Sequence, residues 1–297
     1  MSNLVCVSGD FCSGSTLLYT LFRKSSQYYC LYEPLHERLR EYLQYRVQPD
    51  EGDHHFFMED YYAELRPFRR VASLLDPSWG SRDLYLPPDA ERDALYRYFS
   101  YLIGESFGRS PRVMFKENRL AFRLGWFRRH FPAARIVHIY RRKEAQWRSM
   151  VRRGQLFVGR EDIGQDRVDF AGFNLAAFCE DLKATFPELD ARHFTTGFER
   201  FSRLWELSYQ HNRRYADVSI DYDDLVNDFE ATFGRVWEAC GAPPIDISRL
   251  RAFVVKPDQQ PPARRGLRAR LDATTRKLLW HYARARVRLQ ALRESRA

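Results

Sequence analysis

The residues that most constrain the fold of this chain lie near its N-terminus, where an apolar run leads into a loop of small residues. Leu4-Val5-Cys6-Val7 has the length and composition of a buried strand, 8–16 is rich in Gly and Ser, and apolar residues recur at helical spacing from Leu17 onward. Small residues between a strand and a helix let backbone amides approach a phosphate, which the helix N-terminus also attracts. The segment therefore predicts a phosphate-binding loop.

The loop departs from the nucleotide-binding pattern G-x-x-x-x-G-K-[ST] at one position. Gly9, Gly14 and Thr16 have the required spacing, but Ser15 stands where the pattern places its lysine. Kinases and ATPases use that lysine to neutralise the phosphoryl group that they transfer. We therefore expect this loop to anchor a phosphate that is not itself transferred. A glycine-rich turn without a ligand is the alternative.

The charge composition favours an anionic ligand. The chain has 48 Lys and Arg against 39 Asp and Glu, a net charge of +9, and lysine occurs at only six positions. The guanidinium fork of arginine suits phosphate and sulfate. We find no nucleic-acid motif and no lysine-rich tail in the sequence, so we expect no nucleic-acid partner.

Cysteine usage and hydropathy predict a cytoplasmic protein. The five cysteines form no C-x-x-C pair, and His36, His54 and His55 lack metal-ligand spacing, so we expect reduced thiols and no metal. No apolar run approaches the ~20 residues of a membrane span, and the first strand begins too early for a signal peptide.

Short apolar runs separated by helical patterns predict the fold class. Further buried strands are expected at 112–115, 135–140 and 218–222, with helices at 90–107, 119–131, 144–153, 201–216 and 224–240. This alternation is typical of an α/β fold with a parallel central sheet flanked by helices. Ligands of such sheets bind at the carboxyl ends of strands, so the site is expected just after residues 7, 115, 140 and 222.

We expect a single domain over 1–297 with two helical insertions. Residues 40–90 and 154–200 are rich in aromatic side chains without a clean period, and each is a candidate cover for a substrate. Three prolines, at 257, 261 and 262, precede an arginine-rich helix expected at about 268–293.

A second anion site is expected after the strand at 135–140. Ser149 follows Arg141 by eight residues and Arg153 follows Ser149 by four, so Ser149 and Arg153 share one face of the expected helix. Two arginines and a hydroxyl can hold a second phosphate. A solvated basic helix is the alternative.

Three motifs in this order resemble those of sulfotransferases that use 3′-phosphoadenosine 5′-phosphosulfate (PAPS). The loop 9–18 is similar to the family's G-x-x-[RK]-S-G-[ST]-[ST]-L-L, 135–141 with Ser149 to its 3′-phosphate motif, and 219–228 with Pro243 to its YEDL segment. The resemblance implies a P-loop NTPase-like sulfotransferase fold. It also implies PAPS as donor and a hydroxyl group as acceptor. The aromatic insertions at 40–90 and 154–200 suit a small-molecule acceptor such as a sugar, a phenol or a lipid-linked alcohol.

The resemblance assigns donor-binding roles residue by residue. The donor's 5′-phosphate would lie against Cys12, Ser13, Gly14, Ser15 and Thr16, and its 3′-phosphate against Arg141, Ser149 and Arg153. Tyr209 is a loose match to a residue that approaches the adenine, with a core aromatic as the alternative.

Two further positions gain catalytic roles from the resemblance. Tyr32-Glu33-Pro34-Leu35 is similar to the [FY]EP[LV] segment of carbohydrate sulfotransferases, and Glu33 falls where tyrosylprotein sulfotransferases keep a catalytic glutamate. An acceptor hydroxyl must lose its proton as it attacks sulfur, which suits a carboxylate. Lys116 matches a lysine that faces the sulfuryl group. The alternatives are a solvated Glu33, and a Lys116 that lies in water or pairs with Glu117.

The loop departs from the family at Cys12, where the family has Arg or Lys. That charge stabilises the leaving phosphate, and Lys116, Arg23 or Arg142 would have to replace it. Two other functions stay open: a small-molecule kinase, which the missing lysine disfavours, and a non-catalytic adenosine-phosphate binding protein, which Cys12 favours. A reactive Cys12 thiol is a further alternative.

Overall fold

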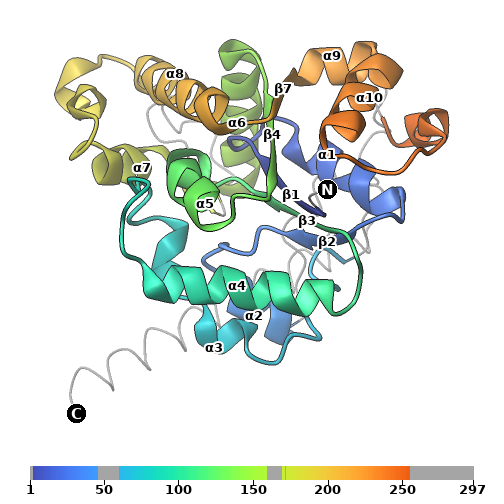
Figure 1. Ribbon diagram of the computed structural model, residues 1–297. Coiled ribbons are helices and arrows are strands. Elements are labelled where there is room, and N and C mark those ends of the chain that lie inside the picture. Colours follow the sequence, from blue (N-terminus) through green and yellow to red (C-terminus); the bar gives the residue numbers. More distant parts are fainter. Residues whose placement is uncertain (1–2, 46–59, 159–168, 171, 255–297) are drawn as a thin grey trace, which may run out of the picture. The chain divides into compact units, whose positions relative to one another are not determined.

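The chain folds around a parallel β-sheet. The computed structural model describes residues 3–45, 60–158, 169–170 and 172–254 of the chain. In this described part, five strands form the sheet in the order β2-β3-β1-β4-β7, and each neighbouring pair is parallel (Figure 1). The strands are β1 (Leu4–Ser8), β2 (Tyr29–Tyr32), β3 (Val113–Glu117), β4 (Arg135–Tyr140) and β7 (Val218–Asp221). The predicted α/β fold with a parallel central sheet is confirmed.

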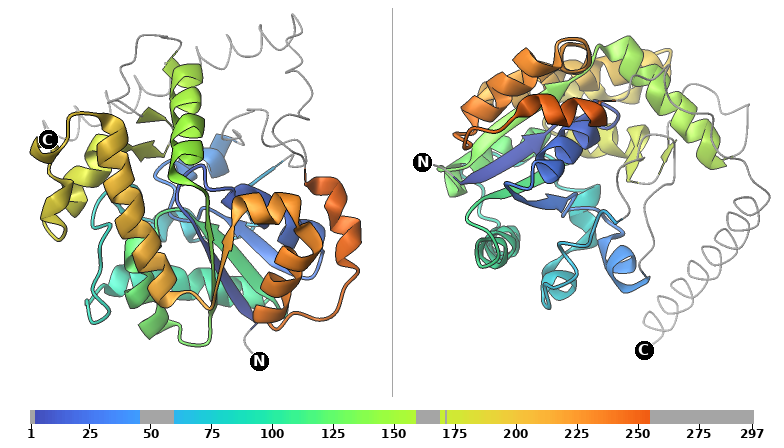
Figure 2. Two further views of the ribbon diagram at one scale, coloured as in Figure 1. Left: turned by 90° about the horizontal axis from the view of Figure 1, so that it is seen from above. Right: turned by 90° about the vertical axis from the view of Figure 1, so that its right-hand side faces the viewer.

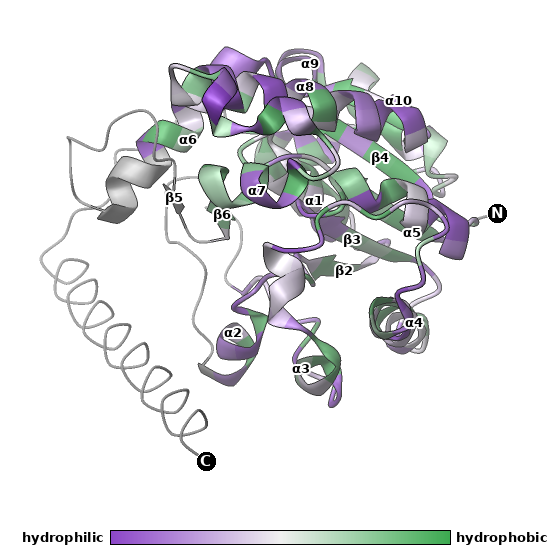
Figure 3. Ribbon diagram, turned by 90° about the vertical axis from the view of Figure 1, so that its left-hand side faces the viewer, coloured by the Kyte–Doolittle hydropathy of each residue, from purple (hydrophilic) through white to green (hydrophobic). Residues whose placement is uncertain are grey.

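Helices cover both faces of the sheet, as the views in Figure 2 show. One face carries α1 (Ser15–Lys24), α9 (Tyr222–Asn227) and α10 (Phe229–Ala239), and the other carries α4 (Asp93–Phe107), α5 (Leu124–His130) and α8 (Gly197–Tyr215). Phe22 of α1 packs against Phe233 of α10. On the opposite face, Phe99 of α4 packs against Phe115 of β3. Because both faces are covered, the strands are nearly continuous apolar runs, which Figure 3 shows as hydrophobic colour along the sheet.

The two predicted insertions carry short elements. The first contains α2 (Leu39–Tyr45), α3 (Val71–Leu74) and the 3-10 turn η1 (Pro77–Gly80). The second follows α6 (Lys143–Val158) and contains the hairpin β5 (Asp169–Phe170) and β6 (Phe173–Asn174), α7 (Leu175–Leu182) and the 3-10 turns η3 (Pro187–Leu189) and η4 (Ala191–His193). The remaining 3-10 segments are η2 (Ala121–Arg123) and η5 (Ile247–Phe253).

Several element boundaries differ from the sequence prediction. Strand β2 was not predicted, the helix expected at 119–131 is η2 followed by α5, and the helix expected at 224–240 divides at Asp228 into α9 and α10. The fourth predicted strand ends at Asp221, because that side chain accepts the Asp223 amide and caps α9. Tyr222 therefore begins a helix and lies at the carboxyl edge of the sheet.

Residues up to Val255 form one compact unit. The helix expected at about 268–293 and the prolines before it lie outside the described residues. The single domain over 1–297 stays a prediction.

Candidate active site

The loop between β1 and α1 has the backbone of a close-approach turn. Gly14 has φ 96°, in the left-handed region, and precedes the first residue of α1. A Cβ at Gly14 would lie 2.1 Å from Tyr222 Cδ2, and a Cβ at Gly9 would lie 2.6 Å from the Ile139 carbonyl oxygen. Both glycines are therefore required by space, and Gly14 also by its backbone conformation.

One buried hydroxyl inside this loop is available to donate a hydrogen bond to a ligand. The Ser13 hydroxyl is fully buried and has no hydrogen-bond partner among the described residues. The first amides of α1 also lack partners within the helix, because helix N-termini leave such groups unsatisfied. Phosphate oxygens accept bonds from both kinds of donor, so the loop fits a phosphate.

Cys12 does not carry the positive charge that the resembled sulfotransferases have at this position of the loop. It is half-buried, with φ 62°, and 9–16 contains no Lys or Arg. Arg23 lies in the last turn of α1 and pairs with Glu64, 2.7 Å away, and Arg142 is exposed and pairs with Asp223 at 3.0 Å. The third predicted replacement, Lys116, is linked to the loop through Glu33 and Asn118.

The sheet register brings Glu33 and Lys116 together. Tyr32 of β2 pairs with Lys116 of β3, which in turn pairs with Val7 of β1, so Glu33 leaves β2 beside Lys116. Both side chains are buried, and Lys116 Nζ donates to Glu33 Oε1. The alternatives of a solvated Glu33 and of a Lys116 in water or paired with Glu117 are therefore wrong in this structure.

Asn118 links this pair to the phosphate loop. Its Nδ2 donates to Glu33 Oε1 over 3.1 Å, and its Oδ1 accepts a hydrogen bond from Ser15 Oγ over 3.0 Å. A second link joins the hydroxyls of Thr16 and Tyr32, 3.2 Å apart. The carboxylate and the loop thus form one hydrogen-bonded unit made from the ends of three adjacent strands.

The backbone turn at Glu33 is held by a second buried carboxylate. Glu33 has φ 38°, a left-handed value that is uncommon for a residue with a side chain. Its amide donates to the Lys116 carbonyl over 2.8 Å. Glu117 is fully buried, and its Oε2 accepts the Leu35 amide over 2.7 Å. These bonds offset the energetic cost of the strained backbone at Glu33. In other proteins, strained backbone conformations cluster at functional sites.

The charges around Glu33 keep it ionised. Burial by itself would raise the pKa of the carboxyl, but Lys116 and Arg119 oppose it and hold that pKa well below its usual value. The pKa of nearby His36 is also lowered, but for a histidine a lower pKa favours the neutral form. Burial, with a smaller contribution from Arg119, lowers the pKa of His36 to about 4, so its ring is neutral at pH 7.

The residues predicted for the 3′-phosphate lie at the exit of β4 and along α6. Arg141 is half-buried, its guanidinium lies 4.6 Å from the centre of the Tyr222 ring, and its Nε is buried without a partner among the described residues. Ser149 is a half-buried residue of α6. Arg153 also belongs to α6, but its side chain lies outside the described part of the structure.

Tyr209 packs at the same edge of the sheet. Its ring stacks on Trp205 at 5.0 Å and meets the Tyr140 ring edge-on at 4.9 Å, and it is half-buried rather than in the core. Trp205 Nε1 donates to the Arg141 carbonyl over 3.2 Å. The predicted adenine contact stays a prediction.

Sequence reasoning missed three residues of this site. Asn118 and Arg119 directly follow the end of β3 at Glu117, so the rule that ligands bind beyond strand ends could have found them. Tyr222, whose ring lies over Gly14 and under Arg141, was assigned to a strand.

The described residues carry neither a metal-ligand cluster nor a helix suited to a bilayer. They contain no cluster of three or more His, Cys, Asp or Glu suited to a metal ion. None of their helices is long and apolar enough to cross a bilayer. His54 and His55 lie outside the described residues, and the cytoplasmic location stays a prediction.

Fold and site together define a class: an α/β protein with a parallel sheet whose first strand-to-helix loop has Ser15 in place of the lysine of nucleotide-binding loops. The sequence matches the sulfotransferase family over residues 5–246, and the chain belongs to that family. Family membership supports a sulfotransferase activity.

The chain is also similar to several solved structures. A sulfotransferase domain from the curacin biosynthetic pathway is 14% identical, with 89% of this chain and 81% of that chain covered and a TM-score of 0.44. A sulfotransferase domain of the Synechococcus PCC 7002 olefin synthase is 15% identical, with 87% and 80% covered and a TM-score of 0.43. A Mycobacterium avium sulfotransferase is 13% identical, with 85% and 67% covered and a TM-score of 0.44. A search of curated proteins found no match.

Proposed function

We propose that this protein transfers a sulfuryl group from PAPS to a hydroxyl of a small-molecule acceptor. The observation that carries the proposal is the hydrogen-bonded unit Ser15–Asn118–Glu33–Lys116, which joins a phosphate loop to a buried, ionised carboxylate. A loop alone would serve binding. A carboxylate and an ammonium fixed beside it supply a base and a positive charge for a transfer reaction.

The donor's two phosphates would each bind one set of polar groups. Ser13, Ser15, Thr16 and the α1 amides would hold the 5′-phosphate, and Arg141, Ser149 and Arg153 would hold the 3′-phosphate. The buried Ser13 Oγ and Arg141 Nε, which lack partners among the described residues, support this division. When bound, PAPS supplies a sulfuryl group on a phosphate leaving group.

Glu33 would act as the general base. It would take the proton of the acceptor hydroxyl at one of its carboxylate oxygens, replacing one of the donors that now hold it. Lys116 would stabilise the negative charge that develops on the transferring group. As Lys116 turns toward that charge, Glu33 loses its strongest counter-charge, which raises its pKa and makes it a better base.

Cys12 is the observation that favours a second candidate, a non-catalytic binding protein for an adenosine phosphate. The loop would then bind the nucleotide through amides and hydroxyls, with no charge provided for a leaving group. Tight product binding without turnover would identify this case. A kinase is disfavoured because Ser15 replaces the lysine that phosphoryl transfer requires.

The experiment that tests the donor is a thermal-shift comparison of adenosine 3′,5′-bisphosphate with AMP and ADP. The bisphosphate is expected to stabilise the protein by about 2.7 kcal/mol at ligand ~100-fold above its Kd. AMP at the same concentration should give far less, because it cannot bond Arg141 through a 3′-phosphate. Equal shifts with bisphosphate and AMP would rule out a 3′-phosphate site.

Replacing Arg141 should remove this discrimination. We expect Arg141→Ala to weaken bisphosphate binding by roughly 1.5–3 kcal/mol, the value of a hydrogen bond to a charged group, and AMP binding by little. Arg142→Ala is the matched control, since Arg142 is the exposed neighbour that pairs with Asp223. Calorimetric titration measures both. Equal losses in the two variants would place the 3′-phosphate elsewhere.

A further inference from the structure

The buried guanidinium of Arg119 contacts the carboxylates around Glu33, the proposed base. The Arg119 side chain is fully buried, and its Nη1 donates to Glu33 Oε2 over 2.9 Å. Its Nη2 donates to Glu37 Oε2, also over 2.9 Å, and its Nη1 lies 3.4 Å from Glu117 Oε1. Three carboxylates therefore share one arginine, and both oxygens of Glu33 are occupied, Oε1 by Lys116 and Asn118 and Oε2 by Arg119.

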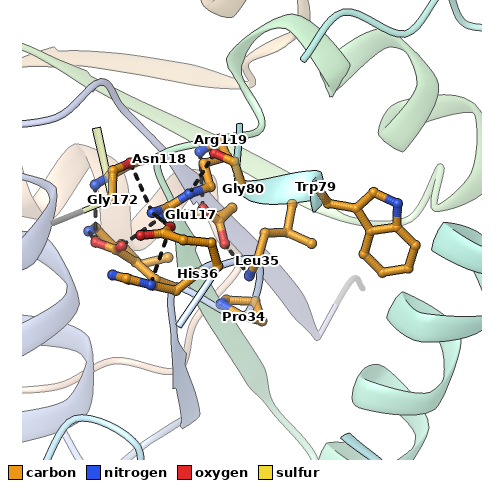
Figure 4. Close-up of polar contacts among 12 residues, drawn as sticks. Pro34, Leu35, His36, Trp79, Gly80, Glu117, Asn118, Arg119 and Gly172 are labelled. Atoms are coloured by element: carbon orange, nitrogen blue, oxygen red, sulfur yellow. Dashed lines mark hydrogen bonds and ion pairs between the residues drawn. The ribbon is translucent and has the colours of Figure 1, made fainter. Parts of the chain in front are cut away.

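The same guanidinium also binds both insertions. Arg119 Nε donates to the carbonyl of Gly80, at the end of η1, over 3.3 Å, and Nη2 donates to the carbonyl of Gly172, in the β5–β6 turn, over 3.1 Å (Figure 4). These carbonyls come from segments 39 and 53 residues away in the chain. Its planar face lies 5.1 Å from the ring centre of Phe11, in the phosphate loop. A fork with five donors in a fixed plane can hold several acceptors in this way, whereas a lysine cannot.

The charge of Arg119 affects the pKa of Glu33. Burial would lower the pKa of Arg119, but Glu37, Glu33 and Glu117 together raise it well above its usual value, so its charge is permanent. The same charge helps to hold the pKa of Glu33 down. Moving Arg119 would therefore change both the direction of Glu33 Oε2 and the affinity of Glu33 for a proton.

We propose that Arg119 is the positioning residue for Glu33 and that it couples the placement of the two insertions to the state of that carboxylate. The proposal rests on the proposed function for the catalytic role of Glu33, but its test does not require turnover. Docking of the β5–β6 turn and of η1 completes the set of acceptors around Arg119. Displacement of either segment would leave Arg119 less fixed and Glu33 less constrained.

Arg123 offers a matched control in the next turn of the chain. It is also fully buried, and its partners among the described residues are backbone carbonyls, those of Trp79, Arg82, Asp83 and Arg119. A loss of folding stability is expected from replacing either arginine, because each replacement leaves buried carbonyls without donors. Of these two arginines, Arg119 is the one that bonds Glu33.

The first test titrates the Glu33 carboxyl by ¹³C NMR in glutamate-labelled protein, with Glu33→Gln identifying the signal. In Arg119→Met the pKa of Glu33 should rise by about 1–3 pH units, the range for removing an adjacent opposite charge. Arg119→Lys should restore part of the low value because the charge returns without the fork. Arg123→Met should shift the Glu33 titration far less than Arg119→Met does, because Arg123 bonds the Trp79 and Arg119 carbonyls but not Glu33 itself.

The second test displaces Arg119 without altering any charge. Gly172 has φ 90°, and a Cβ there would lie 2.4 Å from Arg119 Nη2. Gly172→Ala should therefore shift the Glu33 titration upward. The control is Gly241→Ala, since Gly241 also has a positive φ, 61°, but no atom within 4 Å of its added Cβ. If Arg119→Met does not fold, this pair of variants decides alone.

A Glu33 titration that is unchanged in Gly172→Ala and in any folded Arg119→Met would overturn the proposal. A shift in these variants that is much smaller in Arg123→Met and absent in Gly241→Ala would support it. Should the shift occur while Glu33→Gln retains full turnover, the positioning contact stands and the proposed base is wrong. The two ideas can therefore fail separately.

Discussion

Glu33→Gln should lower kcat by 10²–10⁴-fold, roughly the contribution of a general base, while leaving nucleotide affinity intact. The amide keeps the size of the carboxylate but cannot accept a proton from the acceptor hydroxyl. Because Glu33 lies beside the loop and is linked to it through the Asn118 and Arg119 side chains, bisphosphate binding should change little. Initial-rate kinetics and calorimetric titration of bisphosphate measure the two quantities on the same preparation.

Glu41→Gln is the matched control for this substitution. Glu41 belongs to α2 and pairs with Arg38 at the protein surface. Its replacement should leave both kcat and affinity unchanged. A Glu33→Gln protein with wild-type turnover would remove Glu33 from the mechanism.

Lys116→Met should lower kcat by about 10²–10³-fold, the cost of removing one donor that stabilises charge in a transition state. Methionine fills a similar volume, and Glu33 keeps Asn118 and Arg119 as partners, so the fold is expected to survive. Bisphosphate affinity should fall little, because Lys116 would act on the sulfuryl group that the product lacks.

Cys12→Arg in the Lys116→Met background tests whether Lys116 replaces the charge missing from the loop. Part of the lost rate should return, since an arginine at residue 12 brings a cation back to the position where the family has one. The outcome against this account is a Lys116→Met protein with an unchanged rate and a Cys12→Arg single variant that is many times faster than wild type. The native protein would then be a weakened enzyme or a binding relative.

Local patterns were sufficient to predict the frame of this site. The apolar run of β1, the glycines at 9 and 14 and the start of α1 are adjacent in sequence, so spacing alone located the loop. The runs in β3 and β4 are buried on both faces, which makes them recognisable without partners. Strand β2 was missed because Tyr29-Cys30-Leu31-Tyr32 is too short to show a clear pattern, and it is a strand through its pairing with β3.

The contacts that hold the base could not be predicted in the same way. Glu33 and Lys116 are 83 residues apart, and only the strand order β2-β3-β1 makes them neighbours. Arg119 was placed in a predicted helix, but Glu117 accepts its amide over 3.0 Å and keeps that residue in a turn before η2. Its partners Gly80 and Gly172 lie in insertions with no periodic pattern, where tertiary contacts determine the backbone.

The most direct measurement of the central claim follows ³⁵S from labelled PAPS into a panel of phenols, sugars and long-chain alcohols. Wild-type protein is expected to form sulfated product and adenosine 3′,5′-bisphosphate in equal amounts with at least one acceptor class, and Glu33→Gln at least 10²-fold less of both. Bisphosphate that binds tightly while no acceptor in the panel receives label would contradict the account and identify a nucleotide-binding protein.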